Sequence, residues 1–216
     1  MSDKFVLRTY FRSTAAYRVR IALNLKGADY SLLPVNLLKG EQKSADYKQH
    51  NPEGLVPTLE AESAVLTQSM AILEYIEESM PTPALLPRGP IDRAHVRAFA
   101  QSIACDIHPL NNLRVLKYLV NDMGVSEEEK LTWYHHWIKT GFTSLEARLA
   151  NNDHGGPFCF GETPSIADVC LVPQVYNANR FNCPLDDYPN IRRIEAHCLT
   201  LPAFEKARPE HQPDAN

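Results

Sequence analysis

The stretch FRSTAAYRVRIALNLKG, residues 11–27, decides the fold of the first half of the chain. The apolar run Phe5–Tyr10 before it is typical of a β-strand, and Ala16–Lys26 places apolar residues at helical spacing before a glycine. Ser13 and Thr14 therefore stand where a strand gives way to a helix. Either hydroxyl suits a helix cap. A thiolate at the same place would gain a hydroxyl hydrogen bond and the positive end of the helix.

Strands and helices continue to alternate as far as residue 78. Pro34 lies inside the next apolar run and cannot donate a ladder hydrogen bond, so this strand belongs at a sheet edge. Ser69 is positioned to cap the helix that follows the last strand. The order β-α-β-α-β-β-α predicts a small mixed sheet covered by helices. After the first strand and helix, the predicted elements are a strand at 30–37, a helix at 42–50, strands at 55–60 and 64–69, and a helix at 69–78.

The second half of the chain contains helical patterns only. A segment with four prolines, residues 80–90, precedes them and predicts a linker. Ser165 with Asp168 has the spacing of a capping box, as has Ser126 with Glu129, so we assign Asp168 to folding and not to catalysis. The predicted helices span 92–123 with an interruption at Pro109, 126–150, 163–181 and finally 188–202, and residues 208–216 are expected to form a loose tail.

The composition restricts the class of protein. With 216 residues and 44% hydrophobic content, the chain is long enough for one large domain or two small ones. Its formal charge of −4 gives no electrostatic reason to expect nucleic acid binding. The five cysteines show no CxxC and no ligand-like spacing with histidine, which favours free thiols over disulfides or zinc. Since the sequence shows no signal peptide and no apolar run near the ~20 residues of a membrane helix, we expect a soluble cytoplasmic protein.

Three local features are candidates for a ligand site. Val56–Pro57 opens a strand, and a cis bond there would hold the Val56 backbone out toward a ligand, whereas a trans proline would only start the strand. Gln68–Ser69 lies where a strand meets a helix, whose free N–H groups suit a carboxylate; the alternative is an ordinary serine cap. Ser13–Thr14 is likewise either a place for a ligand thiolate or an ordinary helix cap. Each feature alone is explained by local structure, and only their combination indicates a site.

Together these segments resemble the glutathione transferases. In the first half, the opening stretch, NPEGLVPTL (51–59) and QSMAILEYIEE (68–78) closely resemble the zeta class, which includes glutathione-dependent maleylacetoacetate and maleylpyruvate isomerases. In the second half, CDIHPLNNLRVLKYL (105–119), FGETPSIADVCLVPQVYNANRF (160–181) and HQPDAN (211–216) fit the same class.

The resemblance implies the glutathione transferase fold. This is an α/β thioredoxin-like N-terminal domain, placed at residues 1–82, followed by a linker at 83–90 and an all-α C-terminal domain at 91–216. The resemblance also implies glutathione as cofactor, a small dicarboxylate as substrate and a homodimer.

The resemblance assigns roles to single residues. Ser13 and Thr14 match the two serines of the family's Ser-Ser-Cys motif, and Ala15 replaces its cysteine, so the sulfur nucleophile has to come from glutathione. All three lie at the sulfur end of the cofactor, where we favour Ser13 as the thiol partner and keep Thr14 as the alternative. The remaining positions that match glutathione contacts are Gln42, Val56 through its backbone, Gln68 and Ser69 at the γ-glutamyl end, and His108, Asn112 and Arg114 in the helical domain.

A dicarboxylate substrate requires fixed positive charge, which the planar fork of arginine supplies. The candidates are Arg12 beside the sulfur site, Arg18 one turn into the helix, and Arg180, which matches a substrate-binding arginine of the family. Each also has an ordinary interpretation, as a solvated loop charge, an ion pair or a helix-end cation.

The activity that the resemblance implies is cis–trans isomerisation by reversible thiolate addition. A transferase that consumes glutathione is the alternative among enzymes, and a non-catalytic binding module is the alternative outside them. The choice between maleylacetoacetate and maleylpyruvate as substrate stays open.

Overall fold

The computed structural model describes residues 5–151 and 155–215. The chain forms two compact units, one made of Met1–Leu85 together with Leu199–Asn216, the other of Leu86–Cys198. We call them the sheet unit and the helical unit. The last residues of the chain group with the sheet unit, whereas the sequence analysis placed the whole of 91–216 in one helical domain.

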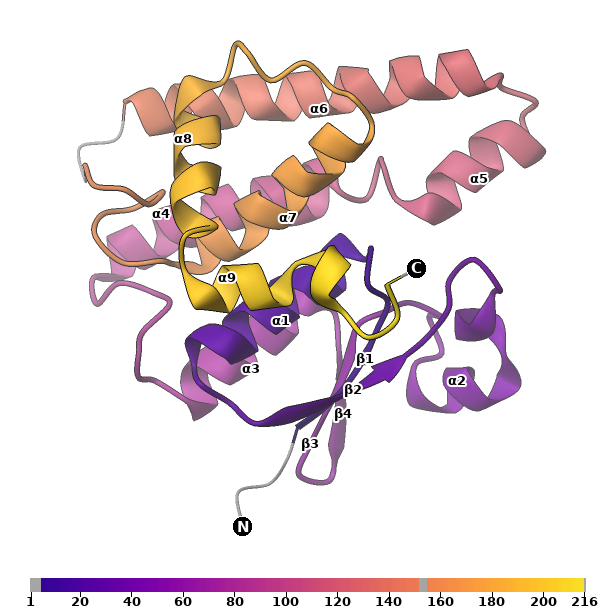
Figure 1. Ribbon diagram of the computed structural model, residues 1–216, viewed down its shortest axis with the longest axis horizontal. Helices are drawn as coiled ribbons and strands as arrows, with labels where there is room; N and C mark the ends of the chain where they lie inside the picture. The colour runs from indigo at the N-terminus through magenta and orange to yellow at the C-terminus, as the bar shows by residue number, and fades with distance from the viewer. Residues whose placement is uncertain (1–4, 152–154, 216) are drawn as a thin grey trace. The chain divides into compact units, whose positions relative to one another are not determined.

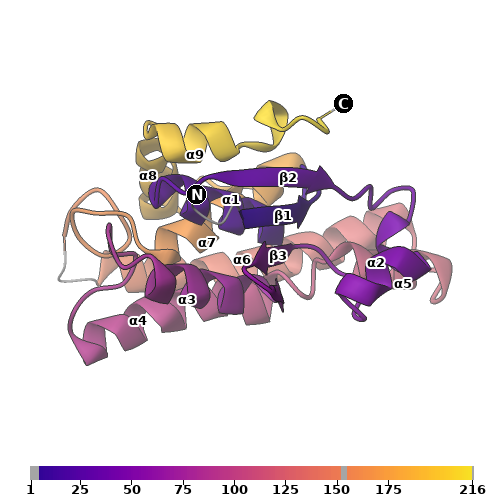
Figure 2. The same ribbon diagram turned by 90° about the horizontal axis from the view of Figure 1, so that it is seen from below.

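The sheet unit is built on four strands, in the spatial order β2 (Tyr30–Pro34), β1 (Phe5–Thr9), β3 (Thr58–Ala61) and β4 (Ala64–Thr67). β1 pairs in parallel with β2 and antiparallel with β3, and β3 pairs antiparallel with β4. Figure 2 shows β1 and β2 side by side. β2 forms an edge, as Pro34 predicted, because a residue without an N–H is tolerated where one side of the strand has no partner.

Within its described residues, the N-terminal part of the sheet unit contains four helical segments. They are α1 (Thr14–Leu25), the short 3₁₀-helix η1 (Glu41–Lys43), α2 (Ala45–His50) and α3 (Ser69–Ser79), so the predicted order β-α-β-α-β-β-α is confirmed. α1 and α3 contact each other, and Figure 1 shows them next to the strands. Their apolar faces and the central strands supply the core of the unit, in which Leu7, Leu23, Leu59, Ile72 and Ile76 are fully buried.

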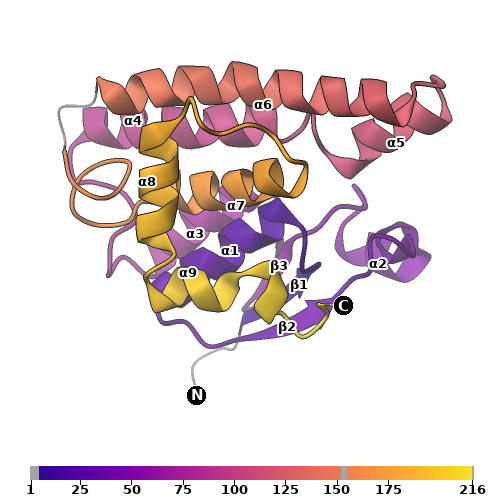
Figure 3. The ribbon, with the colours of Figure 1, turned by 45° about the horizontal axis from the view of Figure 1, so that its top comes forward.

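The end of the chain packs against α1, and the prediction of a loose tail was wrong. α9 (Pro202–Ala207) and the short helix η3 (Pro209–His211) follow what was expected to be the last helix, and α9 lies alongside α1 (Figures 1 and 3). The Asn24 side chain donates to the Ala203 carbonyl at 2.9 Å, and Gln212 is buried. The polar composition of this segment suggested an exposed tail, but its polar groups bond to protein groups instead of water.

The helical unit contains, in chain order, α4 (Pro90–Gln101), η2 (Ser102–Ile107), α5 (Leu113–Asn121), α6 (Glu127–Ala150), α7 (Ile166–Arg180) and α8 (Pro189–Cys198). Figure 3 shows α8 crossing α6, which it contacts, and α8 also contacts α7. Both predicted capping boxes are confirmed, at Ser126 with Glu129 and at Ser165 with Asp168. Within the described part of the chain, no helix is both long enough and apolar enough to span a bilayer.

The interruption predicted at Pro109 is confirmed, and a π-helical turn precedes it. The His108 N–H donates to the carbonyl of Ile103, five residues earlier, at 2.9 Å. Because Pro109 has no N–H and its ring would meet the carbonyl four residues earlier, the helix stops at His108. His108 is thereby fixed at a helix end.

The predicted linker begins with residues that are tied to the sheet unit. Lys26 and Glu77 form a buried ion pair, with 2.6 Å between Nζ and Oε2 and side-chain exposures of 0% and 7%. The Leu85 N–H donates to the same Glu77 oxygen at 2.9 Å, and Lys26 also donates to the Pro83 carbonyl. This cluster joins the end of α1, the end of α3 and the start of the linker.

Candidate active site

A turn at residues 10–13 presents Ser13 at the N-terminus of α1. The Ser13 N–H donates to the Tyr10 carbonyl at 2.8 Å, and the Ser13 carbonyl accepts from the Tyr17 N–H at 2.8 Å. The Ser13 Oγ accepts from the Ala16 N–H at 3.2 Å, which is the N-cap bond. A hydroxyl that accepts through a lone pair keeps its proton for donation. The cap and the thiol partner are therefore compatible roles for Ser13.

The neighbours of Ser13 differ in accessibility. Thr14, the first residue of α1, is only 2% exposed, whereas Ser13 and Ala15 are half-buried. A ligand sulfur reaches the Ser13 hydroxyl more easily. Arg12 is half-buried, and its guanidinium carbon lies 4.7 Å from the centre of the Phe11 ring. The first turn of α1 contains no acidic residue of its own.

Ser69 does not cap α3, contrary to the sequence prediction. α3 begins at Ser69 itself, and the residue before it, Gln68, has a φ of 65°, in the left-handed region. The Ser69 Oγ accepts instead from Nη1 of Arg18, at 3.2 Å. Gln68 is exposed, and its side-chain amide donates to Glu53 Oε2 at 2.7 Å.

Arg18 brings a positive charge to the N-terminus of α3. Its side chain is 1% exposed and contacts Ser69, and the first turn of α3 has no acidic residue. The guanidinium and the helix end thus reinforce each other at one place, which suits a carboxylate. A group buried to this degree offers little surface to a substrate, so Arg18 is better placed to support Ser69 than to hold a substrate directly.

The backbone of Val56 is open to a ligand. The Val56–Pro57 bond is cis. Among the residues that the structure describes, no hydrogen bond uses the Val56 N–H or carbonyl. The residue before it is held firmly, since the Leu55 carbonyl accepts from Tyr47 Oη at 2.6 Å and from Asn51 Nδ2 at 2.9 Å. A peptide could therefore pair with Val56 as an added strand.

Gln42 and the loop at 51–54 complete this side of the site. The Gln42 side chain is 9% exposed, and its buried Oε1 has no hydrogen-bond partner within residues 5–151 and 155–215. Its backbone carbonyl would lie only 3.0 Å from a Cβ at Gly54, where φ is +64°. Two residues of this loop were not predicted from the sequence. Glu53 is the partner of Gln68, and Asn51 Oδ1 accepts from the Glu53 N–H at 3.0 Å. The signal was the turn-forming string Asn-Pro-Glu-Gly.

The predicted site residues of the helical unit lie at helix ends. His108 ends η2, and Asn112 caps α5 by accepting from the Arg114 N–H at 3.1 Å. The Arg114 side chain is exposed. Arg180 is the last residue of α7 and is exposed, with its guanidinium carbon 5.0 Å from the centre of the Phe181 ring. His108, Asn112 and Arg114 thus share one corner, and Arg180 lies at another helix end.

The buried thiols of this chain are poor nucleophiles. Burial raises the pKa of Cys183 to about 12. Burial, together with the Asp168 carboxylate, raises the pKa of Cys159 well above its usual value. The thiolate is the reactive form, so these buried thiols do not replace the cysteine for which Ala15 stands in the motif. In the described part of the chain, no group of three or more His, Cys, Asp or Glu side chains is arranged to hold a metal ion.

Comparisons with known proteins identify the family of the chain. The family models for the N-terminal and C-terminal domains of glutathione S-transferases match residues 6–78 and 138–194. A probable maleylacetoacetate isomerase of Vibrio cholerae is 49% identical over 97% of this chain and 98% of its own length.

Two solved structures extend the comparison. A maleylpyruvate isomerase, described as a bacterial glutathione S-transferase of the zeta class, is 46% identical over 98% of this chain and all of its own, with a TM-score of 0.96. A maleylacetoacetate isomerase of Anaeromyxobacter dehalogenans, with dicarboxyethyl glutathione and citrate in its active site, is 40% identical over 100% and 99% of the two chains, with a TM-score of 0.89.

The likeness covers the thioredoxin-like sheet unit and the helical unit alike, which confirms the fold that the sequence motifs implied. It also spans the stretches at 11–27 and 160–181 from which the class was inferred. The chain belongs to the glutathione S-transferase family, in the zeta class with the maleylacetoacetate and maleylpyruvate isomerases.

Proposed function

We propose that this protein is a glutathione-dependent isomerase that converts maleylacetoacetate to fumarylacetoacetate, a step of tyrosine and phenylalanine breakdown. The observation that carries the proposal is Ser13, whose hydroxyl stands at the N-terminus of α1, accepts from Ala16 and keeps its proton for a thiolate. The relatives described above, at 40%, 46% and 49% identity, bear isomerase names, which supports an isomerase.

The residues of the sheet unit fit glutathione. A γ-glutamyl carboxylate suits the N-terminus of α3, where Ser69 and the buried Arg18 meet. The cysteinyl backbone suits the open N–H and carbonyl of Val56. The buried, unpaired Oε1 of Gln42 suits an N–H donor. We therefore assign these residues, with exposed Gln68, to binding the cofactor.

The chemistry of the site follows from its hydroxyl and its helix end. Bound glutathione would supply a thiolate that adds to one carbon of the cis double bond and departs after rotation, so that it is not consumed. Ser13 donates a hydrogen bond to the sulfur, and the N-terminus of α1 supplies positive potential; both lower the thiol pKa. Ala15 places no competing thiol beside the substrate. Thr14, which is almost fully buried, takes the secondary role.

The substrate carboxylates require accessible cations. We assign them to Arg12, which precedes Ser13, and to Arg180, which is exposed at the end of α7. His108, Asn112 and Arg114 keep their predicted role as glutathione contacts, which their positions at helix ends support.

The proposal is tested by counting product against glutathione. Maleylacetoacetate is followed spectroscopically with glutathione present at a small fraction of the substrate concentration. We expect fumarylacetoacetate in large excess over glutathione, with the thiol concentration unchanged. Loss of one thiol per product would instead show a consuming transferase. No thiol-dependent turnover, together with no retention on a glutathione column, would overturn the enzyme proposal. The same assay with maleylpyruvate ranks the two substrates by kcat/KM.

We also propose that the protein is a homodimer in the cytoplasm. The dimer is what the family resemblance implies, and the free cysteines are consistent with a reducing compartment. Light scattering at micromolar concentration should give about twice the chain mass of 24.4 kDa. A mass of a single chain would reject the dimer.

A further inference from the structure

The turn that carries Ser13 leaves the N–H and the carbonyl of Phe11 without a partner in the turn itself. Its own hydrogen bond joins the Ser13 N–H to the Tyr10 carbonyl at 2.8 Å. Phe11 is the second residue of this turn, and neither of its backbone groups takes part in that bond. The two groups belong to successive peptide units, Tyr10–Phe11 and Phe11–Arg12, whose orientations set where the Ser13 hydroxyl lies.

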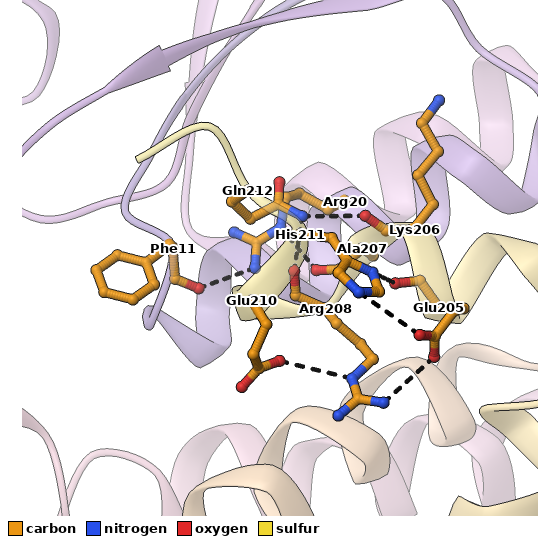
Figure 4. Close-up of polar contacts among 9 residues, drawn as sticks. All are labelled: Phe11, Arg20, Glu205, Lys206, Ala207, Arg208, Glu210, His211 and Gln212. Atoms are coloured by element: carbon orange, nitrogen blue, oxygen red, sulfur yellow. Dashed lines mark hydrogen bonds and ion pairs between the residues drawn. The ribbon is translucent and has the colours of Figure 1, made fainter. Parts of the chain in front are cut away.

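Both groups of the Phe11 residue are held by charged side chains. The Phe11 N–H donates to Asp214 Oδ2 at 2.9 Å, across 203 positions of sequence. The Phe11 carbonyl accepts from Nη2 of Arg20 at 3.0 Å, as Figure 4 shows. Hydrogen bonds to charged groups are the stronger ones in proteins. A carboxylate on one side and a guanidinium on the other therefore fix this backbone.

Arg20 is itself fixed, and it connects the turn to the end of the chain. Its side chain is fully buried, its Nε donates to the Ala207 carbonyl at 3.0 Å, and its Nη1 donates to Thr9 Oγ1 at 3.0 Å. Figure 4 shows this guanidinium between the Phe11 and Ala207 carbonyls. The C-terminal segment thus holds the turn twice, through Arg20 and through Asp214.

The segment that supplies Asp214 is also held in place. The side-chain amide of the buried Gln212 donates to the Lys206 carbonyl at 3.0 Å and to the Arg208 carbonyl at 2.8 Å (Figure 4). These bonds close the chain back on α9 two residues before Asp214. The carboxylate is therefore presented from a fixed backbone.

Asp214 is poorly explained as a stabilising residue. Its second oxygen, Oδ1, is buried and has no hydrogen-bond partner among the described residues. Burying a carboxylate oxygen without a partner is unfavourable. The hydrogen bond to Phe11 is thus what the structure gains from this carboxylate.

We infer that Asp214 is a positioning residue for the reaction: by holding the Phe11 N–H it fixes the turn that aims the Ser13 hydroxyl at the glutathione sulfur. This inference rests on the proposed function of Ser13. Asp214 touches neither the sulfur nor the substrate. Its loss frees the Phe11 N–H, which lets the turn at residues 10–13 shift and moves Ser13, whereas the γ-glutamyl end of glutathione, assigned to Ser69, is unaffected.

The experiment compares Asp214→Ala with Asp214→Asn, Asp214→Glu and the control Glu210→Ala. Displacing a catalytic group by ~1 Å costs up to ~100-fold in rate, so Asp214→Ala should lower kcat/KM roughly 10- to 100-fold. The loss should fall on kcat, with the KM for glutathione within about threefold of wild type. The pKa of the bound thiol should rise. Glu210, in the same segment, pairs at the surface with Arg208 and should have no effect.

The other two variants separate geometry from charge and from folding. Asn keeps an acceptor oxygen at the same distance, so Asp214→Asn should stay within about threefold of wild type. Glu keeps the charge but moves it by one methylene, so Asp214→Glu should lose kcat as the alanine variant does. Asp214→Glu also tests the inference if Asp214→Ala does not fold. Hydrogen exchange of the Phe11 amide should be slow in wild type and faster in Asp214→Ala or Asp214→Glu.

The outcomes distinguish this inference from the proposed function. If the folded alanine and glutamate variants keep the wild-type kcat and thiol pKa, Asp214 does not position Ser13. If the wild-type protein does not isomerise with catalytic glutathione, the proposed function fails instead. The exchange rate at Phe11 then still reports whether Asp214 fixes the turn: rapid exchange in wild type would overturn that part too.

Discussion

Replacing Ser13 by alanine separates the two roles of this residue, because each has its own magnitude and its own measurement. The hydroxyl accepts from the Ala16 N–H at 3.2 Å, and it donates to the glutathione sulfur in the proposed function. The first bond acts on folding, with or without ligand. The second acts on the ionisation of the bound thiol.

The folding effect is small. Loss of an N-cap side chain costs about 1 kcal/mol of unfolding free energy. For a chain of this length, that lowers Tm by about 2–4 °C. Ser13→Ala should therefore still fold and bind glutathione at ordinary temperature.

The effect on the thiol is larger. A hydrogen bond to a charged acceptor contributes about 1.5–3 kcal/mol, and about 1.4 kcal/mol corresponds to one step in pKa. Its loss should raise the pKa of bound glutathione by about one to two. Since Ser13 is half-buried, water takes over part of the bond, and the rise should fall in the lower part of that range.

The assay is a pH titration of the thiolate absorbance of bound glutathione, combined with thermal melts. Ser13→Thr is the matched control, since threonine keeps the hydroxyl and also caps helices. It should titrate and melt close to wild type. If Ser13→Ala melts at the lower temperature but its bound thiol titrates as in wild type, Ser13 is only a cap. The sulfur contact would then pass to Thr14 or to backbone N–H groups.

Two further predictions concern stability, and chemical denaturation checks both. Lys26→Met leaves the Glu77 carboxylate buried without this cation and should cost about 3–5 kcal/mol. The double variant with Glu77→Met should recover only part of this, because the Leu85 N–H then loses its acceptor; a double variant as unstable as the single one would contradict this. Asp168→Ala removes the acceptor of three bonds of 2.8 Å, from the Cys159 N–H and from the N–H and hydroxyl of Ser165. With buried donors left unpaired at about 1–3 kcal/mol each, it should cost over ~3 kcal/mol, whereas Ser126→Ala in the exposed capping box of α6 should cost about 1. Equal losses of unfolding free energy in Asp168→Ala and Ser126→Ala would contradict the expectation that burial makes the box at 165–168 more costly to break.

The elements that sequence patterns predicted well are those with local causes. The capping boxes at 126–129 and 165–168, the stop before Pro109 and the edge strand with Pro34 each depend on a few adjacent residues. The strand and helix order of the sheet unit follows from the same kind of signal. Such features needed no knowledge of the tertiary structure.

The corrections came from contacts between distant residues. Ser69 is a good cap by type, but Gln68 takes a left-handed conformation, and the Ser69 hydroxyl is used by Arg18, 51 positions earlier. The segment after residue 208 is polar enough to suggest a tail, yet Asp214 accepts from the Phe11 N–H, 203 positions earlier. No short window of sequence contains either pair.

The candidate site shows the same division. Ser13, Val56 and Ser69 were predicted as site residues because they stand at strand and helix boundaries and match the family motifs, and their roles stay predictions. Glu53 was not predicted, since it meets Gln68 only when the loop at 51–54 folds back. For Ser13 the local pattern left the cap and the thiol partner as alternatives, because the same hydroxyl geometry serves both.

The sheet unit is built from segments at both ends of the chain, and this affects when it can complete its folding during synthesis. The residues between Leu85 and Leu199 have to be synthesised before α9 exists, which takes about 6–23 s at roughly 5–20 residues per second. During that interval Arg20 lacks the Ala207 carbonyl and Phe11 lacks the Asp214 carboxylate. The nascent sheet unit is therefore incomplete at the turn that carries Ser13. Isomerase competence, on this view, is acquired only when residues 199–214 leave the ribosome and dock.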